Sequence, residues 1–276
     1  TTESAASPLT GTQKVKLAKE GLEPLSEGTK TFNTVLVGTI KGFLDIIYSG
    51  RDFPRFYVLE TVARVPYFSY MSVLHFYETI GLHRKANWIK VHYAEADNEL
   101  HHLLTMEALG GGDSALDRSL AGGMAVAYYW LVVVIYLVNP RGAYHLSQLI
   151  EEHAFATYDK FLTANEEMLR GMEAPQVAVD YYTGGDLYMF DTFHTALDHP
   201  PRRPKIESLF DVFVNIRDDE LEHKSTLKQL VDAGNICSAS CTPSAACAVF
   251  ADECEVSKKP TARGQGTSYT AGGGGA

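Results

Sequence analysis

The stretch that decides the fold is Asp218-Asp219-Glu220-Leu221-Glu222-His223, because it repeats the pattern of Asn98-Glu99-Leu100-His101-His102 earlier in the chain. In both stretches a Glu is followed three positions later by a His. Residues i and i+3 of a helix lie on one face, so the carboxylate and the imidazole can reach the same point. Such a pair is suited to hold a metal ion.

The later tetrad interrupts an apolar helical face, and the earlier one shares its face with further titratable residues. The face of Glu220 and His223 also carries Phe213, Ile216 and Leu227. The face of the earlier tetrad is shared by His92, Glu95, Glu99, His102 and Met106. Because an isolated buried charge costs several kcal/mol, each acid on such a face needs a partner or a metal.

Two further helical stripes carry a single acid each. One consists of Phe56, Glu60, Ala63 and Tyr67, and the other of Glu151, Phe155, Tyr158 and Leu162. Two lone Glu residues and two Glu-x-x-His pairs form the ligand set of ferritin-like di-iron or di-manganese bundles. The sequence therefore predicts an all-α, ferritin-like four-helix bundle with these metal ligands: Glu60, Glu99, His102, Glu151, Glu220 and His223.

Helical periodicity divides the chain into three parts. We predict a flexible N-terminal arm over 1–30, a helical domain over 31–235, and a Cys/Ala/Gly-rich disordered tail over 236–276. The expected helices are 32–48, 56–80 with a kink near Pro66, 85–109, 116–138, 141–170 and 205–232. Periodicity assigns no structure to 181–195.

Composition excludes two classes of protein. The formal net charge of −10 argues against a nucleic-acid binder. A secreted disulfide scaffold would have cysteines throughout the chain, whereas the four cysteines here all lie in the predicted tail, and the core is therefore expected to fold without disulfides. The four are Cys237, Cys241, Cys247 and Cys254.

The segment 120–138 contains no charged residue and is long enough to span a membrane. If it alone spanned, however, Glu99 and Glu151 would lie on opposite sides of the bilayer, although both are expected at one metal pair. We therefore predict a monotopic protein in which helices 32–48 and 116–138 are two additional membrane-facing helices. The alternative is a buried central helix of a soluble domain.

The acidic motifs together resemble those of the alternative oxidases, over roughly residues 30–232. The motifs are Leu59-Glu60-Thr61, Asn98-Glu99-Leu100-His101-His102, Glu151-Glu152-His153-Ala154 and Asp218 to His223. The segment from Tyr181 to Thr195 resembles an insertion of the plastoquinol-oxidising plastid branch. His153 departs from the mitochondrial form of the third motif, which has a Glu at this position.

The resemblance implies a role for each matching residue. Two iron ions would be bound by the six acids and histidines named above, and Tyr158 would assist oxygen reduction. Asn98 and Asp219 would orient the histidines through hydrogen bonds. Four positions would line a quinol site: Arg55, Leu59, Ala154 and Thr157.

The resemblance also implies a function. We expect a plastoquinol oxidase that reduces dioxygen to water, a homodimer lying on one leaflet of the thylakoid membrane of the chloroplast. The chain is expected to lack its transit peptide. Three alternatives stay open: the same chemistry on ubiquinol, as in the mitochondrial branch; a non-catalytic or iron-storage bundle; and a metal-free helical scaffold.

Overall fold

The computed structural model describes residues 23–184, 187–194 and 202–233, and within these ranges it contains helices and no strand. The predicted all-α class is thereby confirmed. The helices are α2 (Glu27–Ile47), α3 (Asp52–Ala63), α4 (Val65–Thr79), α5 (Ala86–Ala108), α6 (Ala115–Val138), α7 (Pro140–Arg170), α8 (Gln176–Gly184), α9 (Leu187–Phe193) and α10 (Leu209–Ala233).

Polar side chains cap several of the helices where they begin. Ser26 accepts a hydrogen bond from the backbone N–H of Thr29, and Asn139 accepts one from the N–H of Gly142. Such caps satisfy backbone N–H groups that have no partner within the first turn. The cap at Ser26 starts α2 at Glu27, five residues before the predicted start, so the first turn of α2 lies within the range predicted to be a flexible arm.

The predicted helix over 56–80 is two helices. It divides at Arg64, two residues before Pro66, which occupies the first turn of α4. A proline lacks the backbone N–H and its ring clashes with the carbonyl of residue i−4, so the break precedes it. Both helices pack against α5 and α6.

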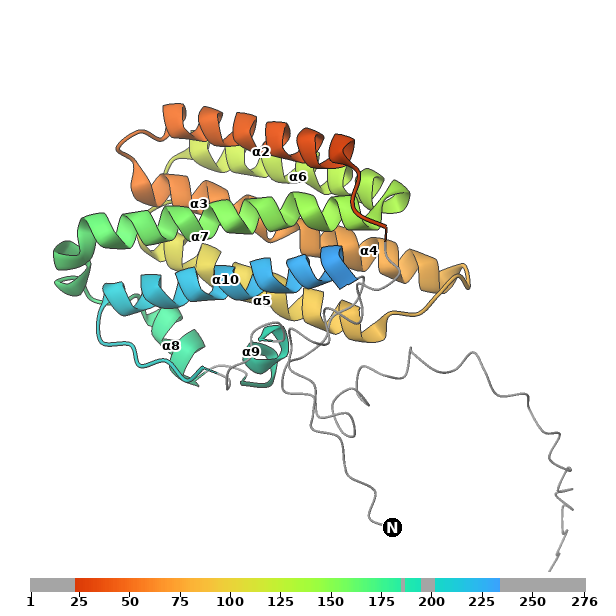
Figure 1. The fold of residues 1–276 in the computed structure, drawn as a ribbon. Coiled ribbons are helices and arrows are strands. Elements are labelled where there is room, and N and C mark those ends of the chain that lie inside the picture. The colour runs from red at the N-terminus through yellow and green to blue at the C-terminus, as the bar shows by residue number, and fades with distance from the viewer. Residues whose placement is uncertain (1–22, 185–186, 195–201, 234–276) are drawn as a thin grey trace, which may run out of the picture.

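Four helices form the central bundle, and each carries predicted metal ligands. α7 and α10 run side by side, and α5 packs against α3 (Figure 1). α8 and α9 pack against α5 at the lower side of the bundle in this view. They occupy part of the segment that periodicity could not assign.

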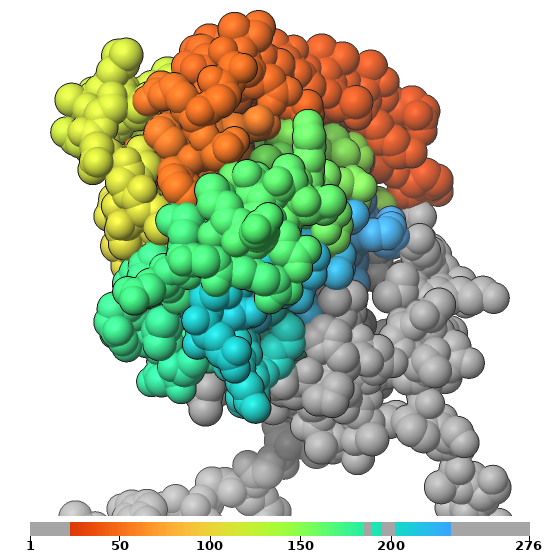
Figure 2. All heavy atoms as spheres, turned by 90° about the vertical axis from the view of Figure 1, so that its left-hand side faces the viewer, coloured from red at the N-terminus to blue at the C-terminus, as the bar shows by residue number. Residues whose placement is uncertain are grey.

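α2 and α6 form an outer layer over this bundle (Figure 1). α2 packs against α7, whereas α6 packs against α3 and α4. Viewed from the end of the bundle, the orange residues of the N-terminal helices lie above the green of α7 and the blue of α10 (Figure 2). The interpretation of α6 as a fully buried core helix is wrong, because much of its length is exposed.

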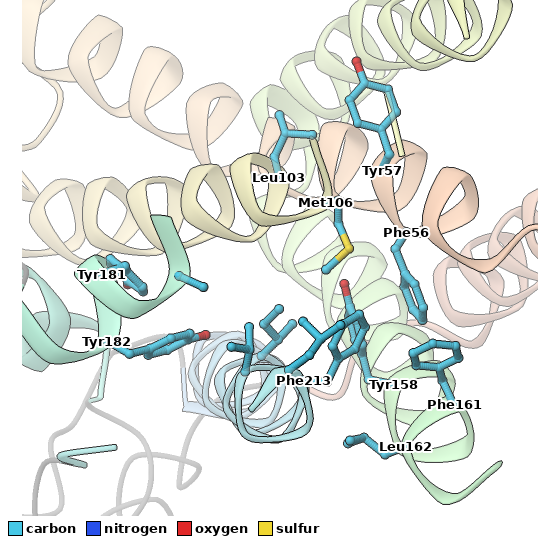
Figure 3. Packing of buried hydrophobic residues seen from close by; sticks show 14 of the residues in the cluster. Phe56, Tyr57, Leu103, Met106, Tyr158, Phe161, Leu162, Tyr181, Tyr182 and Phe213 are labelled. Atoms are coloured by element: carbon cyan, nitrogen blue, oxygen red, sulfur yellow. The ribbon is translucent and has the colours of Figure 1, made fainter. Parts of the chain in front are cut away.

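Aromatic side chains close one end of the bundle core. The ring of Phe56 stacks on that of Tyr158 at a centroid distance of 4.4 Å (Figure 3). Phe161 and Phe213 both meet Phe56 edge-on, and Phe213 also meets Tyr158 at a tilt. The sulfur-bearing side chain of Met106 points into the same cluster from α5. The core therefore brings α3, α5, α7 and α10 together around Tyr158.

Two predictions fall outside the described residues, wholly or in part. The Cys/Ala/Gly-rich tail over 236–276 and most of the predicted arm, residues 1–22, belong to the ranges that the structure does not describe. Both assignments stay predictions.

We predict that Gly111→Ala destabilises the fold. A Cβ there would lie 2.6 Å from the carbonyl oxygen of Phe53 and 2.9 Å from that of Met106, so backbone would have to move. The expected loss is about 1–3 kcal/mol in the free energy of unfolding, measured by denaturant titration. Gly122→Ala is the control, because nothing lies within 4 Å of a Cβ at this helical position. It should raise stability by about 0.5–1 kcal/mol, and equal effects of the two changes would contradict the packing argument.

Candidate metal centre

The structure brings all six predicted ligands together at the middle of the bundle. They form two overlapping groups whose ligand atoms lie within 4.8 Å of one another. Glu60 and His102 belong to the first group, Glu151 and His223 belong to the second, and Glu99 and Glu220 belong to both. The arrangement could hold two metal ions, with Glu99 and Glu220 common to both groups.

The distances between imidazoles and carboxylates are consistent with this pairing. Nδ1 of His102 lies 3.3 Å from Glu220 Oε1 and 3.6 Å from Glu60 Oε2. Nδ1 of His223 lies 2.9 Å from Glu99 Oε1. The two rings are 6.4 Å apart between centroids, so each imidazole faces its own half of the site.

All six side chains are buried, which makes a site of four carboxylates electrostatically unfavourable without cations. Burial raises the pKa of Glu99 and of Glu220 well above the ordinary value, and the neighbouring carboxylates raise both further. For Glu60 burial also acts upward, but the hydrogen bond and charge of His102 lower its pKa overall. A divalent cation would offset the repulsion and favour the ionised form of every carboxylate.

Unpartnered atoms test whether a metal fits here. Within the described residues, both carboxylate oxygens of Glu99 and of Glu220 lack a hydrogen-bond partner. Oε2 of Glu60 and of Glu151, and Nδ1 of both histidines, are unpartnered as well. Buried polar atoms are rarely left unsatisfied in native structures. Oxygen and imidazole nitrogen donors of this kind suit iron or manganese, so the residues fit a binuclear metal site.

Tyrosines donate hydrogen bonds to the two carboxylates that belong to only one group each, Glu60 and Glu151. The hydroxyl of Tyr158 donates to Glu60, and that of Tyr67 donates to Glu151 at 2.8 Å. Tyr158 is a predicted site residue, whereas the sequence places Tyr67 only on the helical stripe of Glu60. Burial raises the pKa of both phenols well above the ordinary value, so both stay protonated donors.

Asp219 connects the site to its surroundings. Its Oδ2 lies 3.0 Å from Nε2 of His102 and also accepts hydrogen bonds from Asn98 (3.0 Å) and Tyr182 (2.8 Å). Its Oδ1 pairs with the guanidinium of Arg202. Asp219 thus contacts His102 directly, whereas Asn98 contacts Asp219.

Sequence reasoning did not find Tyr182 and Arg202. Tyr182 lies on α8, where a short helix rich in aromatic residues gives little periodicity, and its hydroxyl points toward α10 (Figure 3). Arg202 precedes α10, and the first turns of that helix separate it in sequence from Asp219. The only available signal was a buried acid adjacent to Glu220 that needed a cation.

The four predicted quinol-site residues occupy different surroundings. Leu59 lines a largely apolar cavity of about 410 Å³ between α2, α3, α6 and α7, together with His153. Arg55 pairs with Asp45 at 2.5 Å. Ala154 is buried, and Thr157 donates to the carbonyl of His153. Among the described residues, the walls of this cavity include Leu59 but not the other three.

A family model described as alternative oxidase matches residues 26–232. The chain is 53% identical over 204 residues to "Ubiquinol oxidase 4, chloroplastic/chromoplastic" of Arabidopsis thaliana, covering 74% of this chain and 58% of the relative. It is 30% identical to "Ubiquinol oxidase" of Trachipleistophora hominis, with the same coverage, and 29% identical to "Ubiquinol oxidase, mitochondrial" of Mangifera indica over 65% of this chain and 51% of the relative. The chain therefore spans little more than half the length of these relatives.

We predict that Asp219→Asn weakens binding of a divalent metal. Asparagine keeps the shape but removes the charge that orients His102, and loss of such a partner costs about 10-fold to 100-fold in metal affinity. The measurement is competitive metal titration against a chelator. Asp218→Asn is the control, because the neighbouring acid pairs with Arg217 away from the ligands. Unchanged affinity in Asp219→Asn would show that His102 is held by other contacts.

Proposed function

The chain belongs to the alternative oxidase family, and we propose that it is a quinol oxidase that couples oxidation of plastoquinol to the four-electron reduction of dioxygen to water. Its cofactor would be two iron ions bound by Glu60, Glu99, His102, Glu151, Glu220 and His223. The observation that carries this proposal is the pair of overlapping carboxylate–imidazole groups that share Glu99 and Glu220.

The two irons would supply the redox chemistry of oxygen reduction, and the protein supplies geometry and protons. Tyr158 lies at the carboxylate of Glu60, to which its protonated hydroxyl donates a hydrogen bond within the site. The aromatic cluster of Phe56, Phe161 and Phe213 around Tyr158 excludes water from this end. A shielded site limits the escape of partly reduced oxygen.

The substrate would enter through the apolar cavity between the outer layer and the ligand helices. The cavity is lined mainly by aliphatic side chains, as a lipid-soluble quinol requires, and Leu59 lies one residue before Glu60 on its wall. His153 is the polar group in this wall nearest along the chain to Glu151. We propose that Arg55, Ala154 and Thr157 line the inner end of the route, where the quinol head would meet the site.

The choice of plastoquinol follows from the relatives. The relative that is 53% identical carries a chloroplast name, whereas the named mitochondrial relative is 29% identical. We infer a plastid location for this chain, on the thylakoid membrane, where plastoquinol is the available quinol. Ubiquinol in its place is the alternative that a substrate comparison decides.

The outer layer would place the protein on the membrane. α6 is the helix in the described part of the chain that is long and apolar enough to span a bilayer. Its exposed face carries Val126, Trp130 and Val134, and α2 adds Val35 and Ile46, the latter 80% exposed. Because α5 and α7 flank α6 in the chain and both contribute ligands to one site, α6 cannot cross alone. We therefore propose a monotopic protein with α2 and α6 in one leaflet, and a homodimer as its assembly.

Replacement of Glu151 by Ala should abolish both metal binding at the second group and quinol-dependent oxygen uptake. The control is Glu152→Ala, because Glu152 is exposed and pairs with Lys224 instead. Purified variants would be compared by iron content and by an oxygen electrode with plastoquinol and ubiquinol analogues. Two bound irons and full oxygen uptake in Glu151→Ala would refute the ligand assignment. Iron without quinol-dependent uptake in the unmodified protein would favour a storage bundle, and absence of iron a metal-free scaffold.

Membrane binding should depend on the exposed face of α6. Val134→Glu places a charge on that face, and binding to neutral phosphatidylcholine vesicles should fall about tenfold in a flotation assay. Tyr93→Glu introduces the same charge at an exposed position of α5, outside the outer layer, and should leave binding unchanged. Equal losses in the two variants would contradict the proposed orientation.

A further inference from the structure

A second buried cluster of titratable groups lies beside the metal centre and has no part in the function proposed above. His92 and Glu95 on α5 are fully buried, and Nδ1 of His92 lies 2.8 Å from Oε2 of Glu95. Nε2 of the same ring lies 3.1 Å from the hydroxyl of Tyr144 on α7. The three side chains form a phenol–imidazole–carboxyl triad in the interior.

The neutral form of His92 allows one of its ring nitrogens to accept a hydrogen bond in this triad. Burial lowers the pKa of His92 to about 3, so its ring is neutral and one nitrogen is free to accept. A consistent arrangement has Tyr144 donating to Nε2 and the N–H at Nδ1 donating to Glu95. Tyr136 lies 2.7 Å from the Tyr144 hydroxyl and can donate to it, which leaves the Tyr144 proton directed at His92.

A continuous row of aromatic rings connects this triad with the metal centre. The ring of Tyr67, whose hydroxyl donates to Glu151, lies 5.7 Å from that of His223. Tyr70 follows at 6.2 Å from Tyr67, and Tyr144 at 4.6 Å from Tyr70. Each ring thus neighbours the next from a ligand to the triad.

The row continues toward the surface. Trp88 packs edge-on against Tyr144 at 6.3 Å and is only half-buried. Within the described residues, these oxidisable side chains come from α4, α5 and α7, so no single helical repeat explains their alignment.

Chemistry at the site gives such a row a use. Reduction of dioxygen consumes four electrons, and each quinol supplies two. Oxidising equivalents therefore remain at the site when oxygen reacts before enough quinol has bound. A buried phenol such as Tyr144 cannot ionise beforehand, because burial and the nearby Tyr136 and Tyr70 raise its pKa well above the ordinary value. It can lose an electron readily only if its proton leaves at the same time, and His92 is placed to receive that proton.

We propose that Tyr144 is a redox-active tyrosine, connected to the oxygen-reducing site through Tyr70 and Tyr67 and coupled to His92 and Glu95 for its proton. This proposal rests on the proposed function, which supplies the oxidant. Tyr144 loses one electron to a one-electron oxidant formed during oxygen reduction, and its phenolic proton moves to Nε2 of His92. The neutral tyrosyl radical returns to tyrosine when it takes one electron from a quinol-derived reductant and the proton comes back from His92.

The test uses iron-loaded, fully reduced enzyme mixed with dioxygen in the absence of quinol and frozen at successive times. Electron paramagnetic resonance would count and time the tyrosyl radicals. In the unmodified protein we expect a long-lived tyrosyl signal that Tyr144→Phe removes. Tyr48→Phe is the matched control, because Tyr48 is equally buried but bonds to Asp117 outside the row, and it should leave the signal unchanged.

Two further measurements separate the proton acceptor from a structural effect. His92→Gln keeps a hydrogen-bonding side chain without a basic nitrogen, so the long-lived signal should be lost although Tyr144 is present. Tyr144→Phe should oxidise quinol at the unmodified rate in steady state but inactivate faster when quinol is withheld. Unfolding curves would verify that both variants are folded.

The outcomes distinguish this inference from the proposed function. Quinol-dependent oxygen uptake with the same radical yield and lifetime in Tyr144→Phe as in the unmodified protein would overturn the inference alone. The same holds for equal losses of signal in Tyr144→Phe and Tyr48→Phe. Absence of quinol-dependent oxygen uptake in the unmodified protein would instead overturn the proposed function.

Discussion

The mutual repulsion of four carboxylates buried among two imidazoles is the constraint on which the rest of the structure depends. Glu60, Glu99, Glu151 and Glu220 come from four helices and are buried in two overlapping groups, where water cannot screen them. Desolvation of each ion costs several kcal/mol unless an opposite charge offsets it. Bound cations would relieve this repulsion, and their binding would then be linked to folding.

The surroundings of the site serve this constraint on two sides. On one side Asp219 holds His102 and is itself held by Arg202, Asn98 and Tyr182, so a segment outside the four ligand helices contributes to their alignment. On the other side α2 and α6 cover α3 and α7 and leave an apolar cavity at Leu59. A lipid-soluble reductant could thus approach a strongly polar centre without crossing water.

The sequence carried most of the site because helical spacing is a local property. The Glu-x-x-His tetrads fix which side chains share a face, and charge on an apolar face signals a need for metal, so Glu99, His102, Glu220 and His223 follow from the pattern. Glu60 and Glu151 could be predicted as ligands only together with the two Glu-x-x-His tetrads, since a single acid on a helix is common. The observed helix ends differ from the predicted ones where a capping residue or a proline determines the end, as at Ser26 and Pro66.

The sequence by itself determined the helical class, the ligand helices and the types of donor atom, because helical periodicity and side-chain chemistry are local properties of the sequence. Only the tertiary structure decided that Asp219 meets Arg202, that Tyr67 meets Glu151, and that His92 lies between Glu95 and Tyr144. Apart from the His92–Glu95 pair, which lies on α5, these contacts join separate segments of the chain. Their partners are selected by how the helices pack, which no local spacing encodes.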